Sequence, residues 1–219
     1  MSARQASELD FAFARNGWNA EEVKKLSTGD ILSSVREVIL GRSEIKPKEH
    51  AWTEENGIIR FSVTSDGTTG PAWIKRLEKK GFRIGDHARS ILKSKDFKPT
   101  SGITTEVVVL KGMLFSDENR VTKKIRAYAE TLSFNSQKPE KPNPEIACLI
   151  REKFSDEDLE AMGLAWIVAM HEPINDSGGN PSLLGADRDD DGSWLGAGLD
   201  NPGGRWIGDG GFAFALPQG

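Results

Sequence analysis

Three aspartates near the C-terminus have the spacing of a cation-binding loop. Asp187, Asp189 and Asp191 alternate along the chain and Gly192 follows them, which matches the D-x-D-x-D-G start of a calcium loop. Such a loop needs a bidentate Glu at its twelfth position, where this chain has Gly198. Asp-Gly is also a strong hairpin signal. We therefore expect a β-hairpin turn here, with a calcium site at the three aspartates as the alternative and no other cofactor.

His171 and Glu172 form a second pair that could do chemistry, at the end of an apolar segment. A histidine beside a carboxylate can carry out acid–base catalysis, as a small hydrolase would require. The other histidines, His50 and His87, lie far outside metal-ligand spacing of this pair. We expect the pair to make structural hydrogen bonds, and we keep the hydrolase as an alternative function.

Polar and aromatic residues gather on the expected turns of residues 187–210. Loops that are fixed on a rigid sheet and that mix aromatic with adaptable polar side chains are typical of recognition surfaces. This pattern favours binding over catalysis, so no catalytic residue is assigned. The candidate ligand-binding residues are Asp187, Asp189, Asp190, Ser193, Trp194, Asp200, Asn201, Arg205, Trp206, Ile207 and Asp209.

The first 50 residues are predicted to form a small helical segment. Asn19 and Glu22 have the spacing of a capping box at the start of one helix, and Thr28 is a candidate cap for the next. A polar stretch, EIKPKEHAWTEENG, follows as a linker.

Residues 56–219 are predicted to form an α+β domain. Expected helices span residues 71–80, 86–94, 119–133 and 143–153, and a further short helix follows the candidate cap Ser155. Expected strands cover 58–64 and 103–115, and four short strands with Gly/Asp/Asn/Pro turns fill the C-terminal third.

Composition indicates a soluble globular protein. The chain has 219 residues, of which 37% are hydrophobic and 28% charged. No apolar run approaches membrane-spanning length and the N-terminus lacks the features of a signal peptide, so we expect a cytoplasmic protein without a membrane partner. The single cysteine, Cys148, excludes an intramolecular disulfide and is expected to be a buried structural thiol.

Charge is distributed unevenly along the chain. Residues 68–126 hold 14 Lys and Arg against 6 Asp and Glu, a net charge of +8, whereas residues 155–219 hold 2 against 12, a net charge of −10. We expect two oppositely charged surfaces in one fold, which could also drive self-association. The basic segments have few aromatic residues between their charges, which makes nucleic acid an unlikely partner.

Residues 56–219 resemble a group of uncharacterised, paralogous bacterial proteins. The resemblance runs from GIIRFSVTSDGTTGPAWIKRL through PNPEIACLIREKFSDEDLEAMGLAWIVAMHEPI to WLGAGLDNPGGRWIGDGGFAFALPQ. The ending is similar to the variable proteins of diversity-generating retroelements, which have a C-type lectin-like (formylglycine-generating-enzyme-type) fold. Gly211 and Phe212 match the closing strand of that family, and Ala213 stands where the family has Arg.

The resemblance implies a C-type lectin-like domain with a variable face. A strand near 58–64 would pair with the final strand, 211–216, and residues 187–210 would be displayed to a ligand. The implied function is non-catalytic binding of an unidentified protein or small molecule. A calcium-stabilised adhesion or structural module is the alternative from the aspartate spacing.

Overall fold

The computed structural model describes residues 3–15, 19–26, 31–44, 50–189 and 191–217. The chain divides into two compact units, residues 1–49 and residues 50–219. Within the described ranges, no helix has the length and apolar character needed to cross a membrane.

The N-terminal unit contains three helices, α1 (Ala3–Arg15), α2 (Ala20–Lys25) and α3 (Ile31–Ile39). The capping box at the start of α2 is confirmed. The Glu22 amide donates to Asn19 Oδ1 at 3.0 Å, and the Asn19 amide donates to Glu22 Oε2 at 2.8 Å. The other candidate cap, Thr28, lies outside the described residues.

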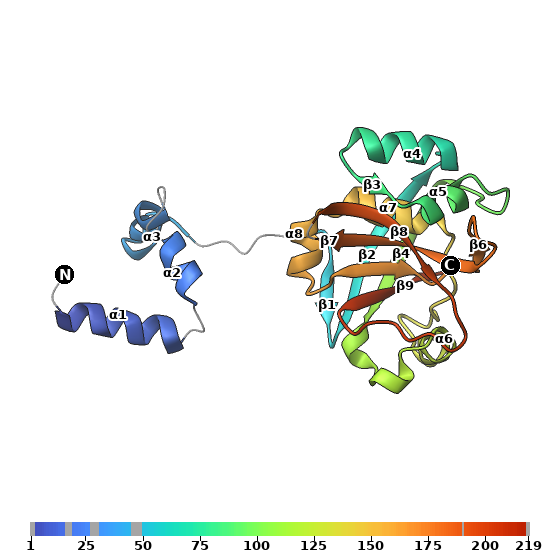
Figure 1. The fold of residues 1–219 in the computed structure, drawn as a ribbon. Coiled ribbons are helices and arrows are strands. Elements are labelled where there is room, and N and C mark those ends of the chain that lie inside the picture. The colour runs from blue at the N-terminus through green and yellow to red at the C-terminus, as the bar shows by residue number, and fades with distance from the viewer. Residues whose placement is uncertain (1–2, 16–18, 27–30, 45–49, 190, 218–219) are drawn as a thin grey trace. The chain divides into compact units, whose positions relative to one another are not determined.

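The second unit has a mixed α+β architecture built on a nine-stranded, mostly antiparallel sheet (Figure 1). The strands follow the order β1-β2-β4-β9-β5-β7-β8-β3, with β6 beside β7. Two pairs, β5–β9 and β3–β8, are parallel. The strands are β1 (Thr53–Glu55), β2 (Ile58–Asp66), β3 (Arg83–Ile84), β4 (Ser101–Lys111), β5 (Trp166–Ala169), β6 (Ile174–Asn175), β7 (Pro181–Asp189), β8 (Gly192–Leu199) and β9 (Gly210–Leu216).

The expected helices of this unit are confirmed. They are α4 (Gly70–Lys79), α5 (Asp86–Leu92), α6 (Thr122–Thr131), α7 (Glu145–Lys153) and α8 (Asp156–Ala161). Ser155 caps α8 in a capping box with Asp158. The expected strand 103–115 is shorter than predicted, because the chain enters a 3-10 turn at Gly112, where a β-carbon would clash with the Gly208 carbonyl oxygen.

Side chains alternate between two cores, one on each face of the sheet. On β4, Val107 and Val109 belong to the core beneath α4, α5, α7 and α8, whereas Val108 and Leu110 belong to the core beneath α6. The same alternation holds on β5, where Ile167 lies on the first face and Val168 on the second. The period-2 pattern therefore decides which residues are available to a site on either face.

The strand pairing implied by the lectin-like resemblance is wrong. Strand β2 does not pair with the final strand β9, because the long, Val-rich strand β4 lies between them. Val107 of β4 pairs with Phe61 of β2 on one side and with Ala215 of β9 on the other. A strand that is buried on both faces and hydrogen-bonded along both edges belongs in the centre of a sheet, and the apolar run Val107–Leu110 meets that condition.

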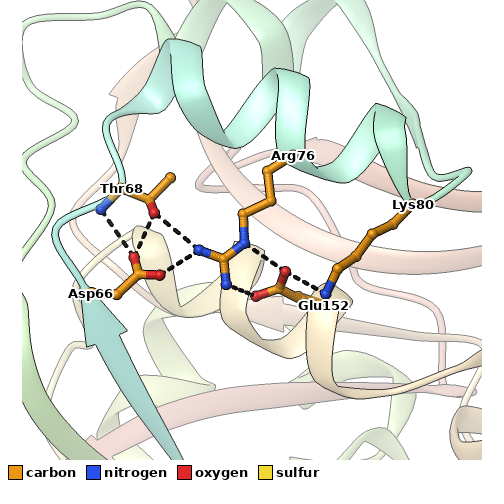
Figure 2. Close-up of polar contacts among 5 residues, drawn as sticks. All are labelled: Asp66, Thr68, Arg76, Lys80 and Glu152. Carbon is orange, nitrogen blue, oxygen red and sulfur yellow. Dashed lines mark hydrogen bonds and ion pairs between the residues drawn. The ribbon is translucent and has the colours of Figure 1, made fainter.

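A charged network ties α4 to α7 (Figure 2). The Arg76 guanidinium of α4 donates to both carboxylate oxygens of Glu152 in α7 and also to Asp66 at the end of β2. Lys80 Nζ lies 2.6 Å from Glu152 Oε1. The hydrogen bonds from Thr68 and Arg76 lower the pKa of Asp66 to about 2. The network holds the helical layer against the sheet on the face opposite α6.

Candidate functional site

The β7–β8 hairpin and strand β5 place a carboxylate between two tryptophans. Asp187 of β7 is directly opposite Trp166 of β5 on one side and Trp194 of β8 on the other. Directly opposed residues in antiparallel strands project to the same face of the sheet. This is the face that carries α6, because Trp166 packs against the core beneath that helix.

A cavity of about 470 Å³ lies on this face, between strands β5, β7 and β8 and the loop 200–208. Its residues include Trp166, Asp187, Gly196, Gly198 and Trp206, and we call it the indole pocket. The two indole ring centroids lie 5.5 Å apart. Leu199 and Ile207 also line it and are 57% and 69% exposed, so the exposed part of the lining includes apolar side chains. A concave, mostly apolar cavity with a few polar groups is typical of a small-molecule binding site.

Glycines on β8 and β9 lack side chains where Asp187 and the two indole rings of the pocket lie. A β-carbon at Gly196 would overlap Asp187 Oδ2, and one at Gly198 would lie 2.7 Å from the Trp206 ring. On β9, a β-carbon at Gly210 would overlap the Trp166 indole. The glycines therefore shape this face, because any side chain there would displace the carboxylate or an indole.

The loop that carries Trp206 is fastened to the start of α6. The Trp206 amide donates to the Arg120 carbonyl at 2.8 Å, and the Arg120 Nε donates to the Trp206 carbonyl at 3.0 Å. The indole Nε1 donates to Thr122 Oγ1 at 3.1 Å. Arg120 is thus a positioning residue that fixes one wall of the pocket before any ligand arrives.

The surroundings of the Asp187 carboxylate disfavour its ionised form. Among the described residues, none donates a hydrogen bond to it, although the Asp187 backbone carbonyl accepts one from Arg151 Nη1 at 3.0 Å. Burial raises the pKa of Asp187 to about 6, against the attraction of the Arg151 guanidinium, and Asp189 raises it further. Below neutral pH this group therefore begins to take up a proton.

Five of the eleven candidate ligand-binding residues line the indole pocket. They are Asp187, Asn201, Arg205, Trp206 and Ile207. Asn201 also stabilises the loop, since its Oδ1 accepts from the Gly203 amide at 3.1 Å. Residues from the β7 strand and from the loop 200–208 thus meet at one site.

The other candidates lie elsewhere. Ser193 Oγ donates to Asp156 Oδ2 at 2.6 Å, and Asp200 forms an ion pair with Arg126 at 3.5 Å. Asp189 and Asp209 are exposed outside the pocket lining, and Asp190 lies outside the described residues.

The stretch that resembles a calcium loop forms the expected hairpin, with Asp189 opposite Gly192. Asp191 Oδ2 lies 2.9 Å from Arg83 Nη1, and Asp191 Oδ1 accepts from Trp194 Nε1 at 3.0 Å. The Arg83 guanidinium also stacks over the Trp194 ring at 5.3 Å. In the part of the chain that the structure describes, no group of three or more His, Cys, Asp or Glu side chains is placed to hold a metal ion. Calcium binding stays a prediction from the spacing.

His171 is bonded to the backbone at both ring nitrogens. Its Nε2 accepts from the Leu184 amide at 2.9 Å, and Nδ1 lies 2.6 Å from the Glu172 carbonyl oxygen. Burial lowers the pKa of His171 to about 4, which keeps the ring neutral at physiological pH. The Glu172 side chain pairs instead with Lys141 at the surface. Structural hydrogen bonds, as expected, occupy the groups that a hydrolase would need.

Cys148 is fully buried in α7, and burial raises the pKa of its thiol, as expected of a structural cysteine. The basic and acidic stretches also meet inside this unit, because Arg83 pairs with Asp191 and Arg126 with Asp200. Part of the charge asymmetry is therefore neutralised internally.

Several pocket residues were missed by sequence reasoning. These are Trp166, Val168, Gly185, Gly196, Ala197, Gly198, Leu199 and Gly204. A signal was present in SWLGAGL, where Gly196 and Gly198 alternate with apolar residues and thus mark one face of a strand as empty. Nothing in the local sequence links Trp166 to Asp187, because their neighbourhood depends on the β5–β7 register.

The chain was compared with family models, with curated proteins and with solved structures, and none of them matches.

Proposed function

We propose that this chain is a non-catalytic binding protein that holds its ligand in the indole pocket. The observation that carries the proposal is an apolar cavity that contains one carboxylate without a hydrogen-bond donor among the described residues. Asp187 is half-buried, and a carboxylate that loses water without gaining a partner is costly to the fold. A ligand that supplied the missing partner would offset that cost.

The construction of the pocket supports binding to a preformed site. One wall is a sheet, and the other is a loop held by the reciprocal Arg120–Trp206 bonds. A site that is ordered before binding loses less conformational entropy when the ligand enters.

Blocking the pocket tests this proposal. Fragments would be screened by NMR against the full chain, with the indole N–H signals of Trp166 and Trp206 as reporters. Gly198→Leu places a side chain against the Trp206 ring and should abolish the shifts that hits induce. Gly203→Leu is the matched control, since a β-carbon there meets no atom within 4 Å. If hits bind equally well to the Gly198→Leu protein, or if no fragment binds the wild type, the pocket is not the ligand site.

We extend the proposal to the relationship with variable proteins of diversity-generating retroelements and to their C-type lectin-like fold. It is supported by the position of Asp187, Asn201, Arg205, Trp206 and Ile207, which all come from the expected variable stretch and line one pocket. The strand pairing that this fold implies is not part of the proposal. Sequencing the encoding locus tests it: without a nearby reverse transcriptase and an adenine-differing template repeat, the retroelement origin fails while the pocket proposal stands.

A further inference from the structure

We propose that the ligand of the indole pocket is a small organic cation, an amine or amidine with an apolar body, whose charged N–H groups meet Asp187. This inference rests on the proposed function and adds the chemical class of the ligand.

The pocket holds a hydrogen-bond acceptor without a matching donor. Asp187 presents a carboxylate to which no described residue donates a hydrogen bond, and an ionised carboxylate only accepts hydrogen bonds. The side chain lies between Trp166 and Trp194 in the strand register, and Asp187 lines the pocket together with Trp166. A ligand with a charged N–H group would supply the missing donor and would add a positive charge in hydrogen-bond contact with the carboxylate.

Two indole rings line the pocket beside this carboxylate. Trp166 and Trp206 lie with their ring centroids 5.5 Å apart and with their planes tilted by 42°. The face of an indole carries negative electrostatic potential, and cations are attracted to it most strongly where water is excluded. Aromatic walls with an adjacent carboxylate therefore favour a positive ligand head over a neutral or negative one.

Arg205 also lines the pocket, but its positive charge does not reverse the preference for a positively charged ligand. Its side chain lies at the exposed mouth, where water and salt screen its charge. Asp187 lies deeper, where the effective dielectric constant is lower and the same charge acts more strongly on a ligand.

A matched ligand series tests the inference. Phenethylamine, phenethyl alcohol and phenylacetate have similar apolar bodies and carry a positive, zero and negative charge, respectively. At pH 7.5 we expect the full chain to bind the amine at least about tenfold more tightly than the alcohol, with phenylacetate the weakest. NMR titration of the Trp166 and Trp206 indole signals measures all three.

Two variants separate the charge of Asp187 from the general charge of the protein. Asp187→Asn should remove the preference for the amine while the alcohol still binds. Asp96→Asn removes one exposed negative charge away from the pocket and should leave the preference intact. In the wild type, the preference should also fall between pH 7.5 and pH 5, since burial raises the pKa of Asp187 to about 6.

Each unfavourable result has a distinct meaning. Equal binding of amine and alcohol to the wild type, with both lost in Gly198→Leu, overturns the cation assignment and leaves the proposed binding function standing. An amine preference that survives Asp187→Asn also overturns it. If none of the three ligands shifts the indole signals and the fragment screen finds no binder either, both proposals fail.

Discussion

The Asp187 carboxylate occupies the space that a β-carbon on Gly196 would need. The two residues lie on adjacent strands of the β7–β8 hairpin, and both line the indole pocket. Gly196→Ala should therefore turn the carboxylate away from its position. We expect weaker ligand binding with a change of no more than about 1 kcal/mol in unfolding free energy, because alanine lowers the entropy of the unfolded chain relative to glycine.

Fragment titration and urea unfolding of the same variant provide the two measurements. Gly203→Ala is the control: nothing lies within 4 Å of a β-carbon at that position, so ligand binding should not change and the fold should be stabilised by no more than about 1 kcal/mol. Unaltered binding in Gly196→Ala would show that the position of the carboxylate is irrelevant to the ligand.

Asp187 should make the stability of the domain depend on pH. Its folded pKa of about 6 lies above the ordinary value of 3.8 because of burial. Between these values the folded state binds more protons than the unfolded state, so stability decreases as pH rises from about 4 to about 6. The full shift corresponds to about 3 kcal/mol. Asp187→Asn should be more stable than the wild type at pH 7.5, and the difference should vanish near pH 4.

Denaturant unfolding of the two proteins at several pH values measures this difference. Comparing each variant with the wild type at the same pH removes the contribution of other titrating groups, such as Glu145, whose pKa burial also raises. An Asp187→Asn protein that is less stable than the wild type at pH 7.5 would mean that the carboxylate has a partner in the folded state.

The several hydrogen bonds of the Arg76 guanidinium should contribute more to stability than its positive charge alone. Burial opposes ionisation of Glu152, but hydrogen bonds from Arg76 and Lys80 outweigh it and lower the Glu152 pKa. Arg76→Lys keeps the charge and loses the paired bonds to Glu152 and the bond to Asp66 (Figure 2), so we expect a loss of about 1–3 kcal/mol in thermal or urea unfolding.

Arg89→Lys is the matched control for this variant. Arg89 makes one hydrogen bond to Glu78, and the Glu78 side chain is 45% exposed whereas that of Glu152 is 12% exposed. Its replacement should cost no more than about 0.5 kcal/mol. Equal effects of the two substitutions would show that the charge alone stabilises the contact between α4 and α7.

The sequence predicted most helices and turns well, because they depend on interactions between residues close together in the chain. The Asn19–Glu22 and Ser155–Asp158 boxes are made within four residues, and the Asp-Gly turn forms its hairpin as expected. Strand order has no such local cause. Apolar character alone did not show that β4 pairs with β2 and β9 at once, because that arrangement depends on residues at least 35 positions apart.

The candidate site could be predicted only in part, because it too combines residues that are distant in the sequence. Turn-forming polar residues marked the right stretch of chain, yet the pocket also depends on Trp166 and on the anchor Arg120, which come from other elements. Ser193 and Asp200 were expected to face a ligand, but each has a partner in the fold, Asp156 and Arg126. Polar residues on turns serve folding and binding alike, and only their partners distinguish the two roles.

Residues 50–219 should fold without residues 1–49. This unit has its own buried core on both faces of the sheet. In the described part of the N-terminal unit no residue is buried, and on α3 the side chains of Leu32 and Ile39 are 57% and 77% exposed. We expect the shortened protein to keep the urea midpoint of the full chain and the Trp166 and Trp206 indole signals, because the described residues of both cores and of the indole pocket all belong to residues 50–219. Circular dichroism during urea unfolding and NMR of the indole signals provide the measurements. A lower midpoint, or displaced indole signals, would show that the N-terminal helices contribute to the stability or the shape of the binding domain.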